Sequence, residues 1–583
     1  MAREDLKAWK LISDQEKILC CDRIVELLEA YGVRTVFGMP GVHNLELYRA
    51  LGRGSVRHVA VRHEQGAGFM ADGFARAGGG IGVALTISGP GLTNISTALG
   101  QAWSDSIPIL VLSSALARPD LGMSLGKLHE LDQVRFAETI SSAALALTDC
   151  QAFEQIHRAF VAFETNRPRP AHISIPMDVL ASQSTLRITR RAVPRRPVPP
   201  PAAIQGAVQV LEASERLVII VGGGAVDCGP EVIRVAETLN APVVTTIAAK
   251  GVLPDDHPLT LGCTLQRSEV RSFIARADVI LAIGTELAEP DVFVSAIAEA
   301  EGGGPAQIAG GVLSLARVVR IDIDPLMISR NLEAAVPLWG DAAGTLALII
   351  EQIEQRQIAA GFAAEIEDLR ARTLRSISDQ EAVHQVVLDS LREALDDDAI
   401  VAADMTQLAY SGCILFKAKQ ARTWLFPNGF GALGYALPAA IGAKVACPNR
   451  QVVAIAGDCG FMFTLQELAT AVELRLPIAI LLWDNASLAE IRDYMRCRGI
   501  PELGVYPTNP DFIALAASFG CATEIVAEPA QLRDAVRRAF GRDVPTLIRV
   551  DEATAASWVT KSATTERASL LEPPSMFRNL KDH

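Results

Sequence analysis

The chain has 583 residues, enough for about three or four domains of ordinary size. Half of its residues are hydrophobic and 21% are charged, a balance typical of a well-packed globular enzyme. The net charge of −13 argues against nucleic acid as a partner, because a phosphate backbone binds basic patches.

Cysteine usage and the N-terminus indicate the compartment. The ten Cys residues are scattered without metal-ligand spacing, which suits a reducing environment. The first residues are charged and lack the apolar core of a signal peptide. No apolar run approaches the roughly 20 residues that cross a bilayer. We expect a cytoplasmic protein with no membrane partner.

The first third of the chain alternates short apolar runs with helical periodicity. After a polar leader of about 15 residues, residues 17–31 predict a helix that stops at Gly32. Because several strands alternate with helices, we expect a parallel, doubly wound sheet. The strands are predicted at residues 35–38, 57–61, 82–87, 108–113 and 172–176.

The middle third begins with a linker. Residues 184–202 are rich in Pro and Arg, and they include the basic cluster 187–196. A second α/β domain follows, and a polar helix over 363–375 separates it from the third. Glycines 222–224 resemble a dinucleotide loop but lack its full spacing, so a tight βα turn is favoured. The strands are predicted at residues 217–221, 242–246, 279–283 and 318–322.

The last third predicts strands at residues 400–403, 451–456, 477–483 and 546–550, and then a polar tail. Asp458 and Asn485 each follow one of these strands, at the sheet edge where ligands collect. Such oxygen ligands suit Mg²⁺ or Ca²⁺, and the flanking glycines let backbone N–H groups approach a phosphate. The alternative is an ordinary loop, in which Asp458 caps a helix and Asn485 caps a turn.

Glu64 follows the strand 57–61 and stands between His63 and Gln65, with glycine close behind. Such a carboxylate is either a partner in a helix N-cap or a buried acid that shares its proton with a ligand nitrogen. Taken alone, the residue pattern favours the structural role.

Together these motifs resemble the thiamine diphosphate (ThDP) enzymes of the acetolactate synthase group. The resemblance runs over roughly residues 17–550, in the family's order, and is carried by residues 36–41, 62–67, 88–91, 250–254, 321–325, 434–440 and 457–485. It implies three doubly wound parallel-sheet α/β domains. These are a pyrimidine-binding domain (1–183), a central domain (202–355) and a diphosphate- and Mg-binding domain (376–560).

The resemblance also implies residue roles. Glu64 would hydrogen-bond the aminopyrimidine ring, while Asp458, Asn485 and the Ser487 carbonyl would hold Mg²⁺ on the diphosphate. Leu433 would bend the cofactor, or it is an ordinary core Leu. The family builds each site from two subunits, so a homodimer or homotetramer is implied. Further cofactor contacts would be Pro40, Gly41, Thr406, Gln407, Gly431, Gly457, Cys459, Gly460 and Leu488.

The implied reaction is the decarboxylation of a small 2-oxo acid to an enamine. Protonation then releases an aldehyde, whereas attack on a second oxo acid is carboligation, as in acetolactate synthase. Where acetolactate synthases carry Met, this chain has Glu490, and their following Trp is absent. Residues 491–493, 129–130 and 404–410 look more like 5-guanidino-2-oxopentanoate (2-ketoarginine) decarboxylase.

A guanidinium substrate would need a carboxylate, and Glu490, Glu130 and Asp493 are the candidates. The alternative for Glu490 is a pair with Arg492 or exposure to solvent. His129 would donate a proton to the enamine, because imidazole titrates near neutrality, or it makes a structural hydrogen bond.

Residues 284–290 do not match the Arg-containing FAD contact of acetolactate synthases, so FAD is doubtful. Besides a decarboxylase, the chain could be an acetolactate synthase or an inactive ThDP-binding assembly partner. A dehydrogenase based on glycines 222–224 ranks last.

Overall fold

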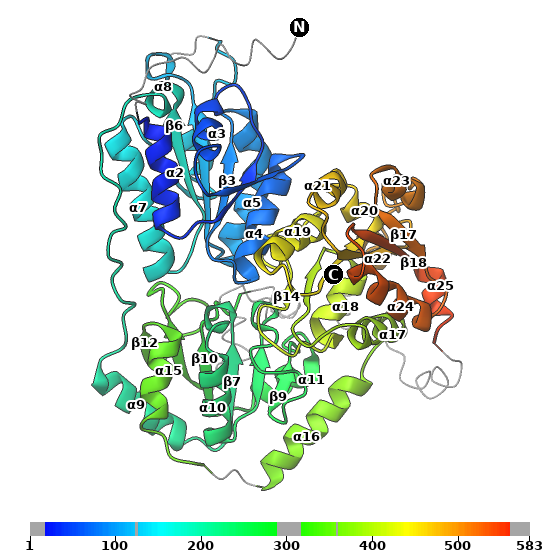
Figure 1. The fold of residues 1–583 in the computed structure, drawn as a ribbon. Coiled ribbons are helices and arrows are strands. Elements are labelled where there is room, and N and C mark those ends of the chain that lie inside the picture. The colour runs from blue at the N-terminus through cyan, green and yellow to red at the C-terminus, as the bar shows by residue number, and fades with distance from the viewer. Residues whose placement is uncertain (1–17, 123–125, 289–315, 357–359, 560–583) are drawn as a thin grey trace.

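The computed structural model describes residues 18–122, 126–288, 316–356 and 360–559. It contains three six-stranded sheets, one in each third of the chain, and every strand pairing in them is parallel (Figure 1). The prediction of three doubly wound parallel-sheet domains is therefore confirmed. The expected polar leader and the tail beyond residue 559 lie outside the described residues.

The N-terminal sheet has the strand order β2-β1-β3-β4-β6-β5. Its strands are β1 (Thr35–Gly38), β2 (Arg57–Ala60), β3 (Gly82–Thr86), β4 (Ile109–Ala115), β5 (Ser142–Leu145) and β6 (Ala171–Pro176). Its helices are α2 (Cys20–Ala30), α3 (Leu45–Leu51), α4 (Glu64–Arg76), α5 (Pro90–Asp105), η1 (Arg118–Asp120), α6 (Gln133–Ala137), α7 (Asp149–Thr165) and α8 (Met177–Leu180).

The central sheet has the order β12-β11-β10-β7-β8-β9. Its strands are β7 (Leu217–Val221), β8 (Val243–Thr245), β9 (Thr260–Gly262), β10 (Val279–Ile283), β11 (Arg317–Asp322) and β12 (Val336–Trp339). Its helices are α9 (Pro201–Glu212), η2 (Gly223–Ala225), α10 (Gly229–Leu239), η3 (Ile247–Ala249), α11 (Ser268–Ile274), α15 (Ala342–Ile350) and α16 (Ala360–Arg375).

The C-terminal sheet has the order β14-β13-β15-β16-β18-β17. Its strands are β13 (Ile400–Ala403), β14 (Trp424–Leu425), β15 (Val452–Gly457), β16 (Ile478–Asp484), β17 (Ala522–Ile525) and β18 (Thr546–Asp551). Its helices are α17 (Asp379–Glu393), α18 (Gln407–Leu415), α19 (Ala436–Ala446), α20 (Asp458–Phe461), α21 (Glu467–Glu473), α22 (Ala489–Cys497), α23 (Phe512–Ser518), α24 (Pro529–Phe540) and α25 (Glu552–Ala556).

Two connecting segments agree with the sequence analysis. Residues 184–200 form neither helix nor strand and are mostly exposed, as expected of a linker. Figure 1 shows this segment running from the N-terminal domain down to α9. The polar helix expected over 363–375 is α16, which lies between the central and C-terminal domains. Among the described residues, no helix combines the length and apolarity needed to span a membrane.

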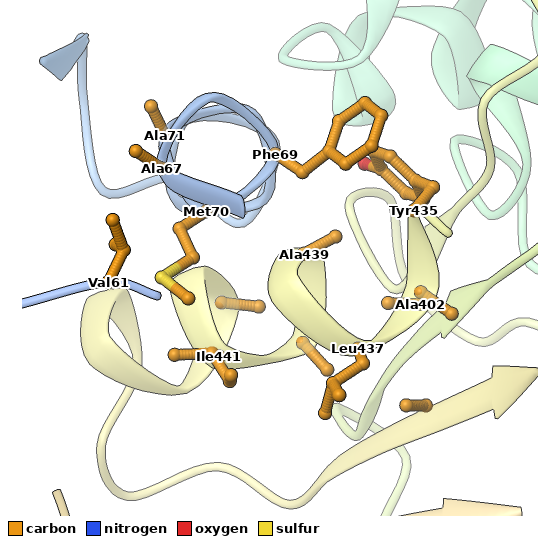
Figure 2. Packing of buried hydrophobic residues seen from close by; sticks show 14 of the residues in the cluster. Val61, Ala67, Phe69, Met70, Ala71, Ala402, Tyr435, Leu437, Ala439 and Ile441 are labelled. Carbon is orange, nitrogen blue, oxygen red and sulfur yellow. The ribbon is translucent and has the colours of Figure 1, made fainter. Parts of the chain in front are cut away.

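The N-terminal and C-terminal sheets share one hydrophobic core, which α4 and α19 fill between them. Figure 2 shows α4 end-on while α19 runs across it, so the two helices cross at a steep angle. Phe69 packs edge-on against Tyr435, with ring centroids 5.5 Å apart. The backbones meet at two glycines, because a Cβ on Gly73 would clash with the Ala439 carbonyl and one on Gly442 with the Met70 carbonyl.

The central domain docks on the C-terminal domain through a short loop. The Lys250 ammonium is buried and pairs with Asp255 at 2.9 Å. Asp255 also accepts a hydrogen bond from the Ala418 amide at 2.8 Å, and its own amide donates to the Ala418 carbonyl at 3.0 Å. Gly251 has a φ of +83° and lies so close to the Gln420 carbonyl that a Cβ would clash with it. Residues 250–255 therefore hold two domains together.

Candidate active site

Neighbouring strands β15 and β16 bring the predicted metal ligands to one edge of the C-terminal sheet. Their parallel register pairs Gly457 with Trp483, so the two strands end side by side. Asp458 is the first residue of α20, and Asn485 directly follows β16. The carboxyl ends of parallel strands are where open α/β sheets bind ligands.

The Asp458 carboxylate is buried, and one of its oxygens has a partner that the sequence analysis missed. Asp458 Oδ2 accepts a hydrogen bond from Asn509 Nδ2 at 2.7 Å. The same amide donates to Asp484 Oδ1 at 3.1 Å, and Asp484 Oδ2 accepts from Arg549 Nε at 2.7 Å. Burial raises the pKa of Asp458, and the bond from Asn509 opposes that rise.

Asn485 makes the turn that the simpler alternative predicted. Its Oδ1 accepts hydrogen bonds from the Ser487 amide at 3.2 Å and from Ser487 Oγ at 3.4 Å. Leu488, the N-cap of α22, donates its amide to the Val505 carbonyl at 2.9 Å. The Asn485 side-chain oxygen, the predicted metal ligand, thus lies at the end of β16 but already accepts hydrogen bonds within its own loop.

Asp404, at the end of β13, organises the loops that face this edge. It is fully buried, and it accepts hydrogen bonds from the amides of Met405 (2.8 Å), Gly434 (3.1 Å) and Ala436 (3.4 Å). Burial raises the pKa of Asp404 to about 6. Its interior position ties β13 to the loop that precedes α19.

The other predicted cofactor residues of this domain surround the same edge. Thr406 and Gln407 are buried at the start of α18, and a Cβ on Gly457 would lie 2.8 Å from Thr406 Oγ1. Gly431 and Leu433 are half-buried, and Leu433 is not among the residues of the described hydrophobic clusters. Cys459 is half-buried, with its pKa raised to about 12 by burial, and a Cβ on Gly460 would lie 3.2 Å from the Asp404 carboxyl carbon.

Glu64 is the first residue of α4, and its side chain is buried at the carboxyl edge of the N-terminal sheet. Glu64 Oε2 accepts a hydrogen bond from Asn94 Nδ2 at 2.9 Å. The helix cap comes from His63, whose Nδ1 accepts from the Gln65 amide at 3.1 Å. Glu64 therefore does not serve as the cap, and its carboxylate is left for another partner.

His129 lies beside a second histidine, His43, which follows Gly41 in the turn after β1 and which the sequence analysis missed. The His129 and His43 rings meet edge-on with centroids 5.1 Å apart, and His43 Nδ1 lies 2.5 Å from Ser88 Oγ. Burial lowers the pKa of His43, and the neighbouring His129 adds to this effect. His129 has a φ of 62°, and its Nδ1 is buried without a hydrogen-bond partner in the described part of the chain. The one sequence signal for His43 is its place in the turn after β1.

Gln133 ties the loop that carries His129 to the rest of the N-terminal domain. Gln133 Oε1 accepts from the Gly89 amide at 3.1 Å, and its Nε2 donates to Ser174 Oγ at 3.0 Å. Glu130 folds back on the same loop and accepts from the Lys127 amide at 3.2 Å. Of the three predicted substrate carboxylates, Glu130 alone therefore belongs to the N-terminal domain.

The other two, Glu490 and Asp493, share one amide donor. Gln407 Nε2 donates to Glu490 Oε2 at 3.0 Å and to Asp493 Oδ2 at 3.3 Å. Arg492 pairs with Asp493 through Nε at 2.9 Å and Nη2 at 3.3 Å. Glu490 is half-buried, so neither expected alternative holds: it is not exposed and it does not pair with Arg492. Burial raises the pKa of Glu490, and the Gln407 bond opposes this.

Two further polar residues extend this cluster, and sequence reasoning missed both. Gln380 Nε2 donates to Gln407 Oε1 at 2.7 Å and to Glu552 Oε1 at 3.5 Å. Burial raises the pKa of Glu552. Gln380 and Glu552 come from the two ends of the C-terminal domain, so local sequence holds no signal for their meeting.

The predicted site residues thus form two groups. Glu64, His129, Pro40 and Gly41 gather at the edge of the N-terminal sheet, and the remaining residues except Glu130 gather at the edge of the C-terminal sheet. Within residues 18–559 as described, no hydrogen bond or ion pair joins Glu64 to Asp458 or Asn485.

The donor set at the C-terminal edge fits a magnesium-bound diphosphate. Asp458, Asn485 and the Ser487 carbonyl offer one carboxylate, one amide and one backbone oxygen, the hard ligands that Mg²⁺ prefers beside a phosphate. The described residues contain no cluster of three or more His, Cys, Asp or Glu side chains that could bind a metal. The donor set proposed here differs from such a cluster, because only one of its three oxygens comes from a carboxylate. Gly457 has no side chain where β15 ends, which lets its backbone lie directly against Thr406.

Comparisons with known proteins identify the family of each domain. The N-terminal TPP binding domain, the central domain and the C-terminal TPP binding domain of thiamine pyrophosphate enzymes match residues 20–136, 204–349 and 404–550. The chain is 43% identical to a probable 2-ketoarginine decarboxylase of Pseudomonas aeruginosa, over 93% of this chain and 95% of that protein. It is 31% identical to a probable acetolactate synthase large subunit of Methanocaldococcus jannaschii, over 91% of each chain.

A third relative is the acetolactate synthase isozyme 3 large subunit of Escherichia coli, 31% identical over 90% of this chain and 92% of that protein. The three domain matches, their order and the full-length similarity agree with the three parallel-sheet domains. The chain belongs to the family of thiamine pyrophosphate-dependent enzymes.

Proposed function

We propose that the protein decarboxylates a 2-oxo acid without oxidation, and that the substrate carries a cation such as the guanidinium of 5-guanidino-2-oxopentanoate. The observation that carries the proposal is the position of Glu490, a half-buried carboxylate in the first turn of α22, just after the metal loop. In the described part of the chain Glu490 has an amide partner but no cationic one, whereas Asp493 is already paired with Arg492. The similarity to the probable 2-ketoarginine decarboxylase of Pseudomonas aeruginosa supports the same substrate class.

The cofactor would be held by both sheet edges. Asp458, Asn485 and the Ser487 carbonyl would bind Mg²⁺, with residues Thr406, Gln407, Gly431, Leu433, Gly457, Cys459, Gly460 and Leu488 around the diphosphate and the thiazolium. When bound, thiamine diphosphate supplies a nucleophilic carbon and an electron sink for decarboxylation. Pro40 and Gly41 would line the pyrimidine side.

The chain's own acids and bases would then move protons. Glu64, buried and not used as the helix cap, would hold a proton at a nitrogen of the aminopyrimidine. His129, whose Nδ1 lacks a partner among the described residues, would donate a proton to the product carbon. Release of an aldehyde follows from that donation, and carboligation takes its place when another oxo acid arrives first.

We propose further that the protein is a cytoplasmic homodimer or homotetramer with sites between subunits. Glu64 and Asp458 must reach one small cofactor, yet no bond links their two groups in the described chain. Exposed apolar side chains flank site residues in both domains, as expected of surfaces that another subunit covers. They are Val42 and Leu45 near Gly41, Leu128 beside His129, and Phe430 beside Gly431.

FAD is not part of the proposal. A cavity of about 980 Å³ lies between the three domains, at the ends of β7, β10 and β11, and its lining includes residues 284–286 and 288. Residues 289 and 290, the end of the segment that does not match the FAD contact of acetolactate synthases, lie outside the described residues. Five of the six arginines that line the cavity are paired with carboxylates, which reduces the positive charge available to a pyrophosphate, while Arg34 donates to the backbone carbonyls of Glu29 and Val33. The pairs are Arg76 with Asp72 and Asp105, Arg167 and Arg330 with Glu286, Arg196 with Asp341, and Arg422 with Asp227.

A substrate panel with separate readouts for aldehyde and acyloin tests the function. We expect aldehyde from 5-guanidino-2-oxopentanoate, and a Glu490→Gln variant with a KM about 10- to 100-fold higher for this substrate. For an uncharged 2-oxo acid of the same length, KM should change little. The control is Glu502→Gln, because Glu502 pairs with Arg496 beyond the end of the same helix and its loss changes the net charge equally.

The second candidate is acetolactate synthase, which the names of the two relatives at 31% identity favour. Abundant acetolactate from pyruvate, with no aldehyde from the guanidino acid, would establish it in place of the decarboxylase.

A further inference from the structure

A buried carboxyl group, Glu467, connects the C-terminal domain to the segment that carries Glu64. Glu467 is the first residue of α21, and its exposed fraction is 0%. Its Oε1 accepts hydrogen bonds from the amide of Arg62 at 3.1 Å and from the amide of His63 at 3.0 Å. These are the two residues directly before Glu64, so a side chain from another domain fixes the backbone where it enters α4.

Gly66 and Thr470 enclose the Glu467 carboxyl group. A Cβ on Gly66 would lie 2.7 Å from the Glu467 carboxyl carbon, so the glycine in the first turn of α4 makes room for the acid. Thr470 Oγ1 donates to Glu467 Oε2 at 2.7 Å and lies 3.3 Å from the Ala60 carbonyl at the end of β2. Both carboxyl oxygens are therefore in use.

The contact between Glu467 and the amides of Arg62 and His63 matters for catalysis, because few other contacts fix the position of the Glu64 side chain. Its carboxylate makes one hydrogen bond among the described residues, to Asn94, and its position otherwise depends on where the backbone enters α4. We propose that Glu467 is a positioning residue, which holds the backbone of Arg62 and His63 so that the Glu64 carboxylate meets its partner nitrogen in the right place. The inference rests on the role proposed above for Glu64.

The chain offers a matched control for the alternative that Glu467 only holds the two domains together. The Arg62 guanidinium pairs with Glu473 at 2.5 Å, at the other end of α21, where both side chains are partly exposed. This ion pair joins the same two segments but lies at the surface, where such pairs contribute little. Glu473→Gln therefore weakens the domain contact without touching the amides before Glu64.

Three substitutions of Glu467 separate the geometry of the contact from its charge. Glu467→Gln can keep both amide bonds through its carbonyl oxygen and donate from its amide to Thr470, so it preserves the geometry. Glu467→Leu leaves two buried backbone N–H groups without an acceptor. Glu467→Asp keeps the acid but shortens its reach by one methylene, which serves if the Leu variant does not fold.

The test measures three quantities on the full-length protein: exchange of the C2 proton of bound ThDP, the ThDP dissociation constant, and amide hydrogen exchange at residues 62–66 without cofactor. In Glu467→Leu we expect C2 exchange to fall about 10- to 100-fold and the amides to exchange faster, at unchanged ThDP affinity. Glu467→Gln and Glu473→Gln should stay close to wild type, and Glu467→Asp should lie between.

A double variant decides whether Glu467 acts through Glu64. If it does, Glu64→Gln with Glu467→Leu loses no more C2 exchange than Glu64→Gln alone. A further loss in the double variant, or a folded Glu467→Leu protein with wild-type exchange, overturns the positioning role. Should Glu64→Gln itself exchange at the wild-type rate, the proposed role of Glu64 fails instead, so the two failures are distinguishable.

Discussion

Asn509 links two carboxylates at the ends of neighbouring strands, and this link restricts how Asp458 can meet a cation. The Asn509 amide occupies Oδ2 of Asp458, so Oδ1 is the oxygen left to face a metal. On its other side the amide is held by Asp484, which is fixed in turn by Arg549. Residues that orient a metal ligand in this way usually contribute to metal affinity.

We therefore expect Asn509→Leu to lower the affinity for Mg²⁺ in the presence of ThDP about 10- to 100-fold, measured by titration of the cofactor-dependent fluorescence change. The control is Asp511→Ala in the same loop, because Asp511 caps α23 and makes no bond to Asp458. An equal loss in both variants would show that loop order, and not the orientation of Asp458, is responsible.

Glu467 also predicts a pH dependence of stability. Burial raises its pKa from 4.5 to about 7, and the amides of Arg62 and His63, the Arg62 charge and the Thr470 hydroxyl oppose the rise. An acid with a raised pKa stabilises the fold in its protonated form, so its contribution is complete below pH 4.5 and is lost as pH rises through about 7.

We expect the melting temperature of the wild type to fall relative to Glu467→Gln between about pH 5 and about pH 8. Thermal unfolding of both proteins without cofactor measures the difference. Parallel pH profiles would contradict the assigned protonation change.

The sequence predicts the site residues that directly follow strands, and it misses those that reach the site from distant parts of the chain. Glu64, Asp458 and Asn485 follow apolar runs that read as strands, so their common edge is predictable. Asn509 and Glu467 act on residues far along the chain, and nothing in their own neighbourhood marks those partners. Only the folded arrangement shows them.

Among the elements, predictability depends on position in the sheet. Of the six edge strands, the sequence analysis predicts β2 alone and leaves out β5, β9, β12, β14 and β17. Interior strands such as β10 are buried on both faces and form continuous apolar runs, whereas β5 and β17 consist only of half-buried and exposed residues. The strand β14 has only two residues, too few for any pattern.

The crossing of α4 and α19 gives a prediction for the two domains that carry the site. Gly442→Ala should destabilise the protein by about 1–3 kcal/mol, because the added methyl group meets the Met70 carbonyl inside the shared core. Gly206→Ala, in the middle of α9, is the matched control. Its Cβ would meet nothing within 4 Å, so it should be neutral or stabilising by up to about 1 kcal/mol.

Thermal unfolding of the two alanine variants measures this difference. Similar melting temperatures for Gly442→Ala and wild type would mean that the helices can separate slightly without loss, and that the glycine contact is not a strict requirement of the domain arrangement.

For the whole molecule, the separation of Glu64 from Asp458 predicts complementation between inactive chains. Glu64→Gln and Asp458→Ala should each abolish activity alone. If sites form between two subunits, subunits mixed at random should regain about a quarter of the sites, because half of the dimers are mixed and each mixed dimer has one intact site. Activity after unfolding and refolding the two variants together measures this, and no recovery would place each site within one chain.

The contact between residues 250–255 and residues 418–420 matters for exchanging parts between relatives. The central domain contributes none of the proposed catalytic residues, which makes it an obvious module to replace. Any replacement must bring glycine at position 251, since the Gln420 carbonyl leaves no room for a side chain there, and a carboxylate at 255 to meet the Ala418 amide. In a chimaera that keeps these two residues, the new central domain should pack against the original C-terminal domain. In one that lacks them, both domains would fold but would not form this interface.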